Sequence, residues 1–325
     1  MGRIEIMNIL VTGGAGFIGS HLIDRLLAEN HQVICFDNFD YFYNPVMKWR
    51  NLEQANKNPN FSLVSGNISD IKDLQKAFIV NQIDAVVHLA AQAGVRPSVQ
   101  NSQLHFSVNV LGTINTLELC KDYNVKKFVL ASSSSVYGNN DKVPFVETDN
   151  VDYPLCPYAA TKRSAELIAY TYHHLYGIDI ACVRPFTVYG PRQRLEMAIP
   201  LFTRLIYQNK EITIFGDGST RRDYTYVEDV VSGIVKILER YHGYEIYNIG
   251  TSQTVSLMEL IYEIENRLDR GARKKFEPIH VGEAKQTFAD ITKARYRLGY
   301  DPKFTIREGI KQYVDWYLQD ISCGT

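Results

Sequence analysis

The sequence lacks the features of a membrane protein, a nucleic-acid-binding protein or a secreted protein. No stretch approaches the roughly 18 uninterrupted apolar residues that a membrane helix needs. The 35 basic and 36 acidic residues leave a net charge of -1, which gives no general attraction to nucleic acid or anionic lipid. Residues 1–6 have neither the apolar length nor the cleavage site of a signal peptide. We therefore expect a cytoplasmic protein that binds neither nucleic acid nor membranes.

Cysteine and histidine are also few and show no ligand spacing. The chain has 5 cysteines, an odd number, and they include no C-x-x-C pair. Its 8 histidines include no H-E-x-x-H pattern. We expect reduced thiols and no metal site.

What the chain does contain is a regular alternation of apolar, β-branched runs with helical patterns through its first half. Its 325 residues are 45% hydrophobic and 22% charged, the composition of an ordinary globular protein, and their number suits two lobes. The alternation predicts an α/β fold with a doubly wound parallel sheet. The expected strands are 8–12, 32–37, 61–65, 85–89, 127–132 and 180–184, and the expected helices include 19–29, 101–122 and 157–176.

The alternation stops after Arg184. Residues from about 185 to 222 are rich in loops, which indicates a second, smaller α/β lobe assembled around a ligand. Residues 245–250 have the pattern of a strand that returns to the main sheet. We therefore expect interleaved lobes, one of residues 7–184 with a returning segment at about 225–250, the other of 185–224 and 251–318.

A glycine-rich turn follows the first expected strand and opens the first expected helix. Gly13, Gly16 and Gly19 permit a tight turn and a close approach of the backbone, so that a pyrophosphate can lie at the positive end of the helix. Asp37, at the end of the second strand, is placed to bond a ribose diol. Its carboxylate would repel a 2′-phosphate, and no arginine follows it directly, so the sequence favours NAD over NADP.

A second constellation predicts proton transfer. Tyr158 and Lys162 are one turn apart on a helix that Pro157 opens, so the ammonium can favour ionisation of the phenol. A serine run, residues 132–135, follows an expected strand at the edge of the sheet where ligands of open α/β sheets bind. Together these residues suggest acid–base chemistry beside the dinucleotide.

With these motifs the sequence resembles the extended short-chain dehydrogenase/reductase family, and within it the nucleoside-diphosphate-sugar epimerases. The fold expected from this resemblance is a Rossmann sheet with a smaller, interleaved substrate-binding lobe. The resemblance covers residues 7 to about 318. It rests on 12–19, 88–91, 109–113, 132–138, Tyr158 with Lys162, 184–186 and 216–224.

The resemblance implies roles for individual residues. Tyr158 is the expected base, Lys162 its activator and a ribose ligand, and Ser133 the catalytic hydroxyl. Phe215 is expected to flank a uracil, and Arg222 to bind a UDP phosphate. The NAD contacts expected are Gly13, Gly16, Phe17, Ile18, Gly19, Asp37, Asn38, Asn67, Ile68, Leu89, Ala90, Ala91, Asn109, Tyr158, Lys162 and Pro185. The expected UDP-sugar contacts are Arg96, Ser133, Ser134, Ser135, Thr187, Arg194, Phe215 and Arg222.

Two positions depart from the family pattern. Many relatives have an aspartate against the adenine where this chain has Asn67, whose amide can still bond adenine. Relatives often have an arginine near the end of the chain where this sequence has His280 and Val281, so Arg222 is expected to bind the diphosphate without a second arginine.

Relatives also pair two long helices per subunit, which implies a homodimer through 101–122 and 157–176.

Comparison with other enzymes of the resembling family excludes two of the possible reactions. Sugar 4,6-dehydratases have Asp-Glu where this chain has Ser134 and Ser135, and UDP-glucuronate decarboxylases have a glutamate at Ser135. A UDP-sugar 4-epimerase remains. Thr187 and the segment to Arg194 look most like UDP-glucuronate 4-epimerases, because hydroxyl groups and an arginine can hold a C6 carboxylate. A UDP-glucose or UDP-N-acetylglucosamine 4-epimerase is the alternative; a nucleotide-sugar reductase and a non-enzymatic NAD-sensing protein are more remote.

Overall fold

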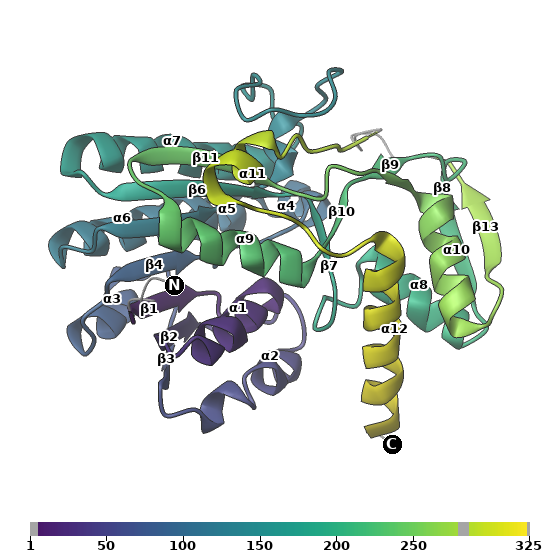
Figure 1. Cartoon of the computed structure of the whole chain (residues 1–325), viewed down its shortest axis with the longest axis horizontal. Helices are drawn as coiled ribbons and strands as arrows, with labels where there is room; N and C mark the ends of the chain where they lie inside the picture. The colour runs from purple at the N-terminus through teal and green to yellow at the C-terminus, as the bar shows by residue number, and fades with distance from the viewer. Residues whose placement is uncertain (1–5, 279–285, 324–325) are drawn as a thin grey trace.

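The main lobe is a seven-stranded parallel sheet in the order β11-β6-β5-β4-β1-β2-β3 (Figure 1). The computed structural model describes residues 6–278 and 286–323; residues 1–5 and the departure at His280 lie outside them. The expected strands are confirmed to within one residue at each end. The strands are β1 (Asn8–Thr12), β2 (Gln32–Asp37), β3 (Phe61–Ser65), β4 (Ala85–His88), β5 (Lys127–Ala131), β6 (Asp179–Pro185) and β11 (Tyr244–Ile249).

Alternate residues of each strand feed two separate cores, because a strand presents successive side chains to opposite faces. Ile9 and Val11 pack with Leu22 and Ile234 on one face, whereas Leu10 packs on the other with Leu117 and Ala165. The first face is covered by α1 (Phe17–Ala28) and α9 (Val227–Arg240), the second by α3 (Ile71–Ile79), α6 (Gly112–Asp122) and α7 (Pro157–Tyr176). The doubly wound α/β class expected from the sequence is confirmed.

The helix expected over 101–122 is one helical path with a change of winding. Asn101 caps its start by accepting a hydrogen bond from the Leu104 amide at 3.1 Å. An α-helical turn, α5 (Ser102–Phe106), leads into a π-helical segment, η2 (Ser107–Leu111), and then into α6. The wider winding carries Asn109, whose side chain bonds neighbouring elements and not solvent. The expected helix 19–29 begins earlier, at Phe17, because Gly16 is its N-cap.

The smaller lobe follows β6 and consists of short sheets and three helices within the described part of the chain (Figure 1). Its sheets pair β7 with β10, β9 with β12 and β8 with β13. The strands are β7 (Thr187–Tyr189), β8 (Glu211–Phe215), β9 (Arg221–Arg222), β10 (Tyr224–Tyr226), β12 (Val255–Ser256) and β13 (Arg273–Glu277). The helices are α8 (Ala198–Tyr207), α10 (Leu257–Leu268) and α12 (Ile306–Cys323). The short helix α11 (Thr292–Leu298) packs against α9 and β11 of the main lobe.

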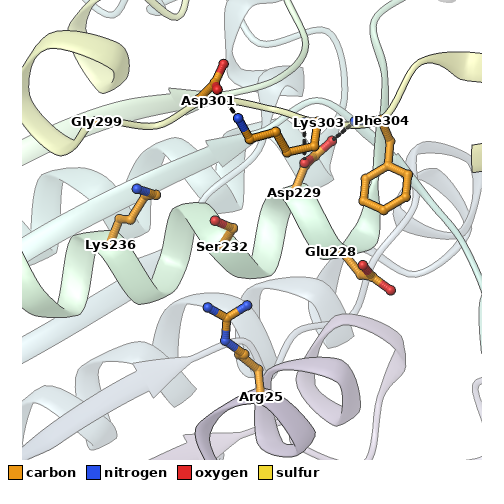
Figure 2. A pocket seen from close by; sticks show the side chains of 9 residues that line it. All are labelled: Arg25, Glu228, Asp229, Ser232, Lys236, Gly299, Asp301, Lys303 and Phe304. Atoms are coloured by element: carbon orange, nitrogen blue, oxygen red, sulfur yellow. Dashed lines mark hydrogen bonds and ion pairs between the residues drawn. The ribbon is translucent and has the colours of Figure 1, made fainter. Parts of the chain in front are cut away.

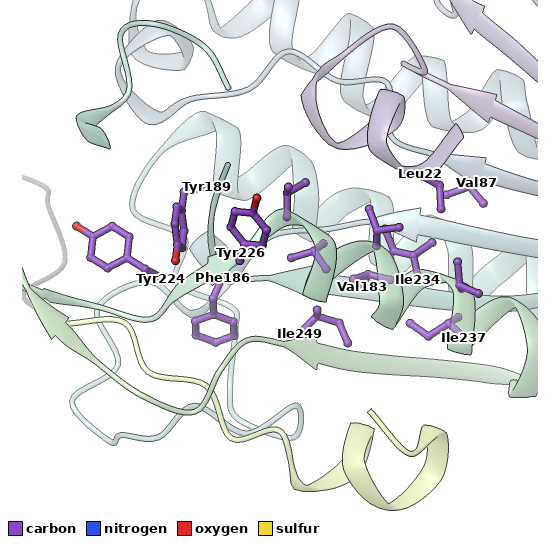
Figure 3. Close-up of a cluster of buried hydrophobic side chains, with 14 of the residues drawn as sticks. Leu22, Val87, Val183, Phe186, Tyr189, Tyr224, Tyr226, Ile234, Ile237 and Ile249 are labelled. Atoms are coloured by element: carbon purple, nitrogen blue, oxygen red, sulfur yellow. The ribbon is translucent and has the colours of Figure 1, made fainter. Parts of the chain in front are cut away.

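Aromatic side chains join the two lobes into one continuous core. Phe186, Tyr189, Tyr224 and Tyr226 lie beside Ile249 of the main sheet (Figure 3). The rings of Tyr189 and Tyr226 make an edge-on contact at 5.6 Å. The start of the smaller lobe is therefore fixed to the carboxyl ends of β6 and β11, the edge where the expected site residues lie.

A buried ion pair ties α7 to the sheet. Arg184 on β6 donates from Nε and Nη2 to the two carboxylate oxygens of Glu166 on α7, each at 2.8 Å. The two side chains are 1% and 0% exposed. The Ser132 hydroxyl donates to the same carboxylate at 2.6 Å, and Arg163 approaches it at 3.2 Å. A bidentate pair of this kind fixes the rotation of α7 relative to β5 and β6.

We predict that Arg184→Met lowers the free energy of unfolding by about 3–5 kcal/mol, because it leaves the buried Glu166 charge without its main partner. Arg163→Met is the matched control, since Arg163 is partly exposed, and its loss should be at most about 1 kcal/mol. Urea denaturation of both variants and of Arg184→Met/Glu166→Leu measures the effect. The double variant should recover much of the loss; equal losses for the two arginines would contradict the prediction.

Candidate active site

The glycine-rich turn brings β1 close to β4 and leaves no room for larger side chains. Gly13 has φ +69°, and a Cβ there would lie 2.7 Å from the Ala90 amide nitrogen. A Cβ on Gly19 would overlap the Gly13 carbonyl oxygen. Phe17 and Ile18 form the first turn of the 12-residue α1, at its positive end. The cradle fits a dinucleotide pyrophosphate.

Asp37 lies at the end of β2, beside this turn, and is held by three contacts. Its carboxylate accepts from the Ala15 amide at 3.2 Å and the Phe39 amide at 2.8 Å. The Lys48 ammonium lies 3.6 Å away, and both side chains are buried. The neighbouring Asn38 accepts from the Asp40 amide at 3.0 Å. A carboxylate fixed in this place suits a ribose diol, so the residues present fit NAD.

The expected adenine-side residues lie at the end of β3. The Asn67 side-chain oxygen accepts from the Ser69 amide at 2.9 Å, which leaves the amide nitrogen as the group to face adenine. Ile68 is buried against Gly112, where an added Cβ would lie 2.6 Å from its Cδ1 atom. Its carbonyl accepts from Asn115 at 2.9 Å. The structure thus groups Asn67 and Ile68 with the start of α6.

Asn109 is a brace between the segment after β4 and α7. Its side-chain oxygen accepts from the Gln92 amide at 2.8 Å, and its nitrogen donates to the Gln92 carbonyl at 3.0 Å. The same nitrogen lies 2.9 Å from the Thr161 hydroxyl. These bonds hold Asn109 against the residue that follows Ala91 and against α7. Its expected contact with NAD stays a prediction.

Tyr158, Lys162 and Ser133 are brought together at the carboxyl end of β5. The Lys162 ammonium lies 5.9 Å from the centre of the Tyr158 ring and donates to the Ala131 carbonyl at 2.7 Å. Ser133 shares a hydrogen bond with the Tyr158 phenol. It also caps the turn η3 (Ser134–Tyr137), accepting from the Ser135 amide at 3.1 Å. Pro185, at the end of β6, lies on the neighbouring strand.

The charges around the pair decide what it can do. Burial lowers the pKa of Lys162 to about 8, while the nearby Glu166 carboxylate opposes that shift. Burial raises the pKa of Tyr158, and the hydrogen bond with Ser133 and the positive charge of Arg194 oppose the rise. The phenol is therefore protonated at neutral pH, and more positive charge beside it, such as a nicotinium ring, favours its action as a base.

The expected substrate residues come from both lobes. Thr187 pairs with Tyr224 across β7 and β10, and its amide donates to the Asp223 carbonyl at 3.0 Å, next to Arg222. Arg96 of the main lobe lies over the Phe215 ring of the smaller lobe at 5.6 Å. The structure thus places Thr187 and Arg222 at or next to the β7–β10 sheet, and brings Arg96 and Phe215 into contact across the lobes.

Arg194 lies between the smaller lobe and the segment that follows β2. Its guanidinium is 4.7 Å from the Phe42 ring centre and 3.2 Å from the Glu196 carboxylate. Its charge also acts on Tyr158. It is therefore close enough to the expected base to act in the same site.

Three partners of these residues have no sequence motif of their own. Glu166 could have been found as the residue four positions after Lys162 on the same helix face. Lys48 and Tyr43 gave no such signal, because their contacts with Asp37 and the glycine-rich turn depend on the path of the chain after β2.

A pocket of about 350 Å³ lies elsewhere, between α1, α9 and residues 299–304 (Figure 2). Its Asp229 carboxylate accepts from the Lys303 and Phe304 amides at 2.7 and 3.1 Å, so it anchors that loop. The pocket contains no expected site residue. Among the described residues no cluster of His, Cys, Asp or Glu could hold a metal ion. The helices of residues 6–278 and 286–323 include none long and apolar enough to cross a membrane.

A nucleotide turn with a Tyr–Lys pair on α7, joined to a second lobe at the ends of the strands, defines an extended short-chain dehydrogenase/reductase. A model of the GDP-mannose 4,6 dehydratase family matches residues 10–313, and the chain belongs to this family. The family resemblance expected from the sequence is confirmed.

Similar proteins include nucleotide-sugar epimerases and a dTDP-glucose 4,6-dehydratase of Streptomyces venezuelae, which has a TM-score of 0.90 at 31% identity, covering 98% of each chain. The UDP-glucuronate 4-epimerase of Thermodesulfobacterium geofontis is 44% identical over 313 residues, 96% of each chain. The Bacillus cereus UDP-glucuronic acid 4-epimerase, solved with UDP-glucuronic acid and NAD, has a TM-score of 0.89 at 38% identity, covering 96% of this chain and 99% of that one. The Thermotoga maritima UDP-glucose 4-epimerase with UDP-glucose has a TM-score of 0.90 at 33% identity, covering 97% and 100%.

Stability should depend on pH through His88, which lies beneath the site. Thr12 and Thr113 hydroxyls lie 2.9 and 3.2 Å from its ring nitrogens, and burial lowers its pKa to about 3. Below about pH 6.5 the imidazole of His88 binds a proton in the unfolded protein but stays neutral in the folded one. The free energy of unfolding therefore falls as the pH drops toward 3. Relative to His88→Gln, the wild type should lose up to about 1.4 kcal/mol more per pH unit in urea denaturation below pH 6. Parallel pH profiles would contradict this.

Proposed function

We propose that this chain interconverts UDP-glucuronate and UDP-galacturonate by NAD-dependent inversion at C4. The observation that carries the proposal is the hydroxyl-lined turn at Ser133–Ser135 beside Tyr158, with Arg194 within electrostatic reach. The turn has no carboxylate where dehydratases and decarboxylases of the family have one. The similarity to two UDP-glucuronate 4-epimerases supports the same assignment.

In the proposed cycle the chain's own residues move one proton. Tyr158 takes the proton from the C4 hydroxyl as the C4 hydride leaves, and Ser133 holds both oxygens in line. Lys162, anchored on the Ala131 carbonyl, supplies the positive charge that favours the phenolate. The chemistry that bound NAD supplies is reversible acceptance of the C4 hydride. The 4-keto sugar turns over, so that the hydride would return to the opposite face of C4 while Tyr158 returns the proton to the C4 oxygen.

The two lobes divide the ligands in this proposal. Residues 7–184, with the segment at about 225–250, hold NAD on the glycine-rich turn and Asp37. Residues 185–224 and 251–318 hold the UDP-sugar, with Phe215 against the uracil and Arg222 on the diphosphate. Because Arg96 contacts Phe215 across the lobes, the nucleotide end of the substrate lies where the lobes meet.

The C6 carboxylate needs a specific restraint. Oxidation at C4 places a ketone β to that carboxylate, and such a compound loses carbon dioxide readily when the breaking bond aligns with the carbonyl π system. Ser134, Ser135 and Thr187, with Arg194 outside them, hold the carboxylate near the ring plane by hydrogen bonds. The restraint keeps the ketone intact while the sugar turns over.

The test of this assignment is incubation with UDP-glucuronate, UDP-glucose and UDP-N-acetylglucosamine in parallel, with the sugar products identified by NMR. UDP-galacturonate from the first substrate at the highest kcat/KM supports the proposal. Turnover of the neutral sugars alone would favour the second candidate, a neutral-sugar 4-epimerase, which the similarity to the UDP-glucose 4-epimerase supports.

We also propose a homodimer. Apolar side chains lie exposed on the helical path α5–η2 and on α7, among them Leu104, Phe106, Leu111, Leu167 and Tyr170. Two such helices from each of two subunits would cover them in a four-helix interface. Elution of the pure protein as a monomer at micromolar concentration would contradict the dimer.

We predict that Tyr158→Phe folds, keeps its cofactor and loses at least ~100-fold in kcat, because only the proton-transfer oxygen is removed. The matched control is Tyr153→Phe, a tyrosine 81% exposed just before α7. Steady-state rates on UDP-glucuronate measure both. Turnover by Tyr158→Phe close to that of the control would eliminate Tyr158 as the base.

We predict that Thr187→Ala and Arg194→Ala slow epimerisation and raise the fraction of UDP-pentose among the products. Each removes a group that restrains the carboxylate, so the ketone spends more time in the geometry that loses carbon dioxide. Chromatography of products from the wild type and both variants at equal conversion measures the fraction. A slower reaction with an unchanged product ratio would show that these side chains do not restrain the carboxylate.

A further inference from the structure

The segment between β2 and α2 (Pro45–Asn51), residues 38–44, crosses beside the glycine-rich turn; we refer to it as the strap. It is locally ordered: Asp40 accepts from the Phe42 amide at 2.7 Å, and Asn44 accepts from the Val46 amide at 3.0 Å. The Phe39 ring stacks on Trp49 of α2 at 3.9 Å with an interplanar angle of 6°. The strap therefore holds a defined path.

The Tyr43 hydroxyl of the strap is directed at the glycine-rich turn. It lies 3.8 Å from the point where a Cβ on Gly16 would stand. Its oxygen is fully buried and has no hydrogen-bond partner within the described residues. Burial and the Asp37 charge raise the pKa of this phenol, so the group stays a donor at neutral pH. A buried donor without an acceptor is destabilising unless a ligand supplies one.

Positive charge lies beside the same hydroxyl. The Lys48 ammonium is 5.0 Å from the Tyr43 ring centre and forms the buried ion pair with Asp37. Opposite these groups is the positive end of α1. An unpartnered donor, an ammonium group and a helix N-terminus that meet at one turn form a site for an anion.

Arg194 links the strap to the substrate side. Its guanidinium covers Phe42, the residue before Tyr43, at 4.7 Å. Its charge acts on both Tyr43 and Tyr158. One side chain therefore lies between the strap and the proposed base.

We propose that Tyr43 and Lys48 form the outer wall of the dinucleotide phosphate site, opposite Gly16, and that Arg194 holds this wall closed through Phe42. The inference rests on the proposed use of NAD. In the proposed cycle NAD would be regenerated in each turnover, so it need not dissociate between turnovers. The wall slows its release. Arg194 thereby links cofactor retention to the loop that receives the sugar.

The test is the rate at which NAD leaves Tyr43→Phe, measured by trapping released NAD with an excess of an NAD-consuming enzyme. Loss of one hydrogen bond to a charged phosphate should speed release about tenfold. The matched control is Tyr41→Phe in the same strap, whose side chain is 90% exposed and whose release rate should equal that of the wild type. Arg194→Ala should also release NAD faster.

Two further readouts separate the possible failures. The thermal midpoint of the NAD-free protein should not fall in Tyr43→Phe, because the hydroxyl that is removed has no partner there. The affinity for UDP should be unchanged, because UDP binds on the other lobe. If Tyr43→Phe binds NAD and releases it at the wild-type rate, the proposed wall is wrong. The proposal is also wrong if the variant loses as much affinity for UDP as for NAD. A wild type that binds no NAD at all overturns the proposed function.

Discussion

The arrangement of the site depends on one buried carboxylate. Glu166 of α7 accepts from Arg184 of β6 and from Ser132 at the end of β5, so a single side chain fixes a helix against two strands. Lys162 lies one turn before Glu166 on α7, and Tyr158 lies two turns before it. Ser133 directly follows Ser132, whose hydroxyl donates to Glu166. The buried pair of Glu166 and Arg184 therefore fixes the relative positions of Tyr158, Lys162 and Ser133. Loss of either partner would leave an unpaired buried charge, which is strongly destabilising. The same carboxylate opposes the loss of the Lys162 proton, so it acts on the charge of the site as well as on its geometry.

The two lobes meet where the parallel strands end, and this edge collects groups from distant parts of the chain. The glycine-rich turn follows β1, Asp37 ends β2, the serine turn follows β5, and Pro185 ends β6. The smaller lobe begins at once after β6 and is fixed to the sheet by Phe186 and the tyrosines around it. A ligand on this edge touches both lobes, and the strap with Arg194 adds a link across it from the cofactor side.

The sequence predicted the main sheet to within one residue because its central strands, β1, β2, β4, β5 and β6, are buried on both faces and have continuous apolar runs. It also predicted the Tyr158–Lys162 pair and the glycine-rich turn, whose geometry depends on local spacing alone. It did not predict the contact of Arg96 with Phe215, which come from different lobes, or the ion pair of Asp37 with Lys48, which depends on the path of the strap. The bonds of the Asn109 amide to the Gln92 backbone and to Thr161 could not be predicted either, because they join separate segments of the chain. Local patterns fix local geometry, whereas contacts between segments follow from packing.

The central claim is that the hydride removed from C4 would stay on bound NAD and return to C4 of the same sugar. The most direct measurement uses UDP-glucuronate with deuterium at C4, converted in ordinary water and analysed by NMR and mass spectrometry. The account predicts UDP-galacturonate that keeps the whole deuterium label at C4, with none lost to solvent and none transferred to added NAD. Product whose C4 carries solvent hydrogen, or label that accumulates in free NADH, would contradict it.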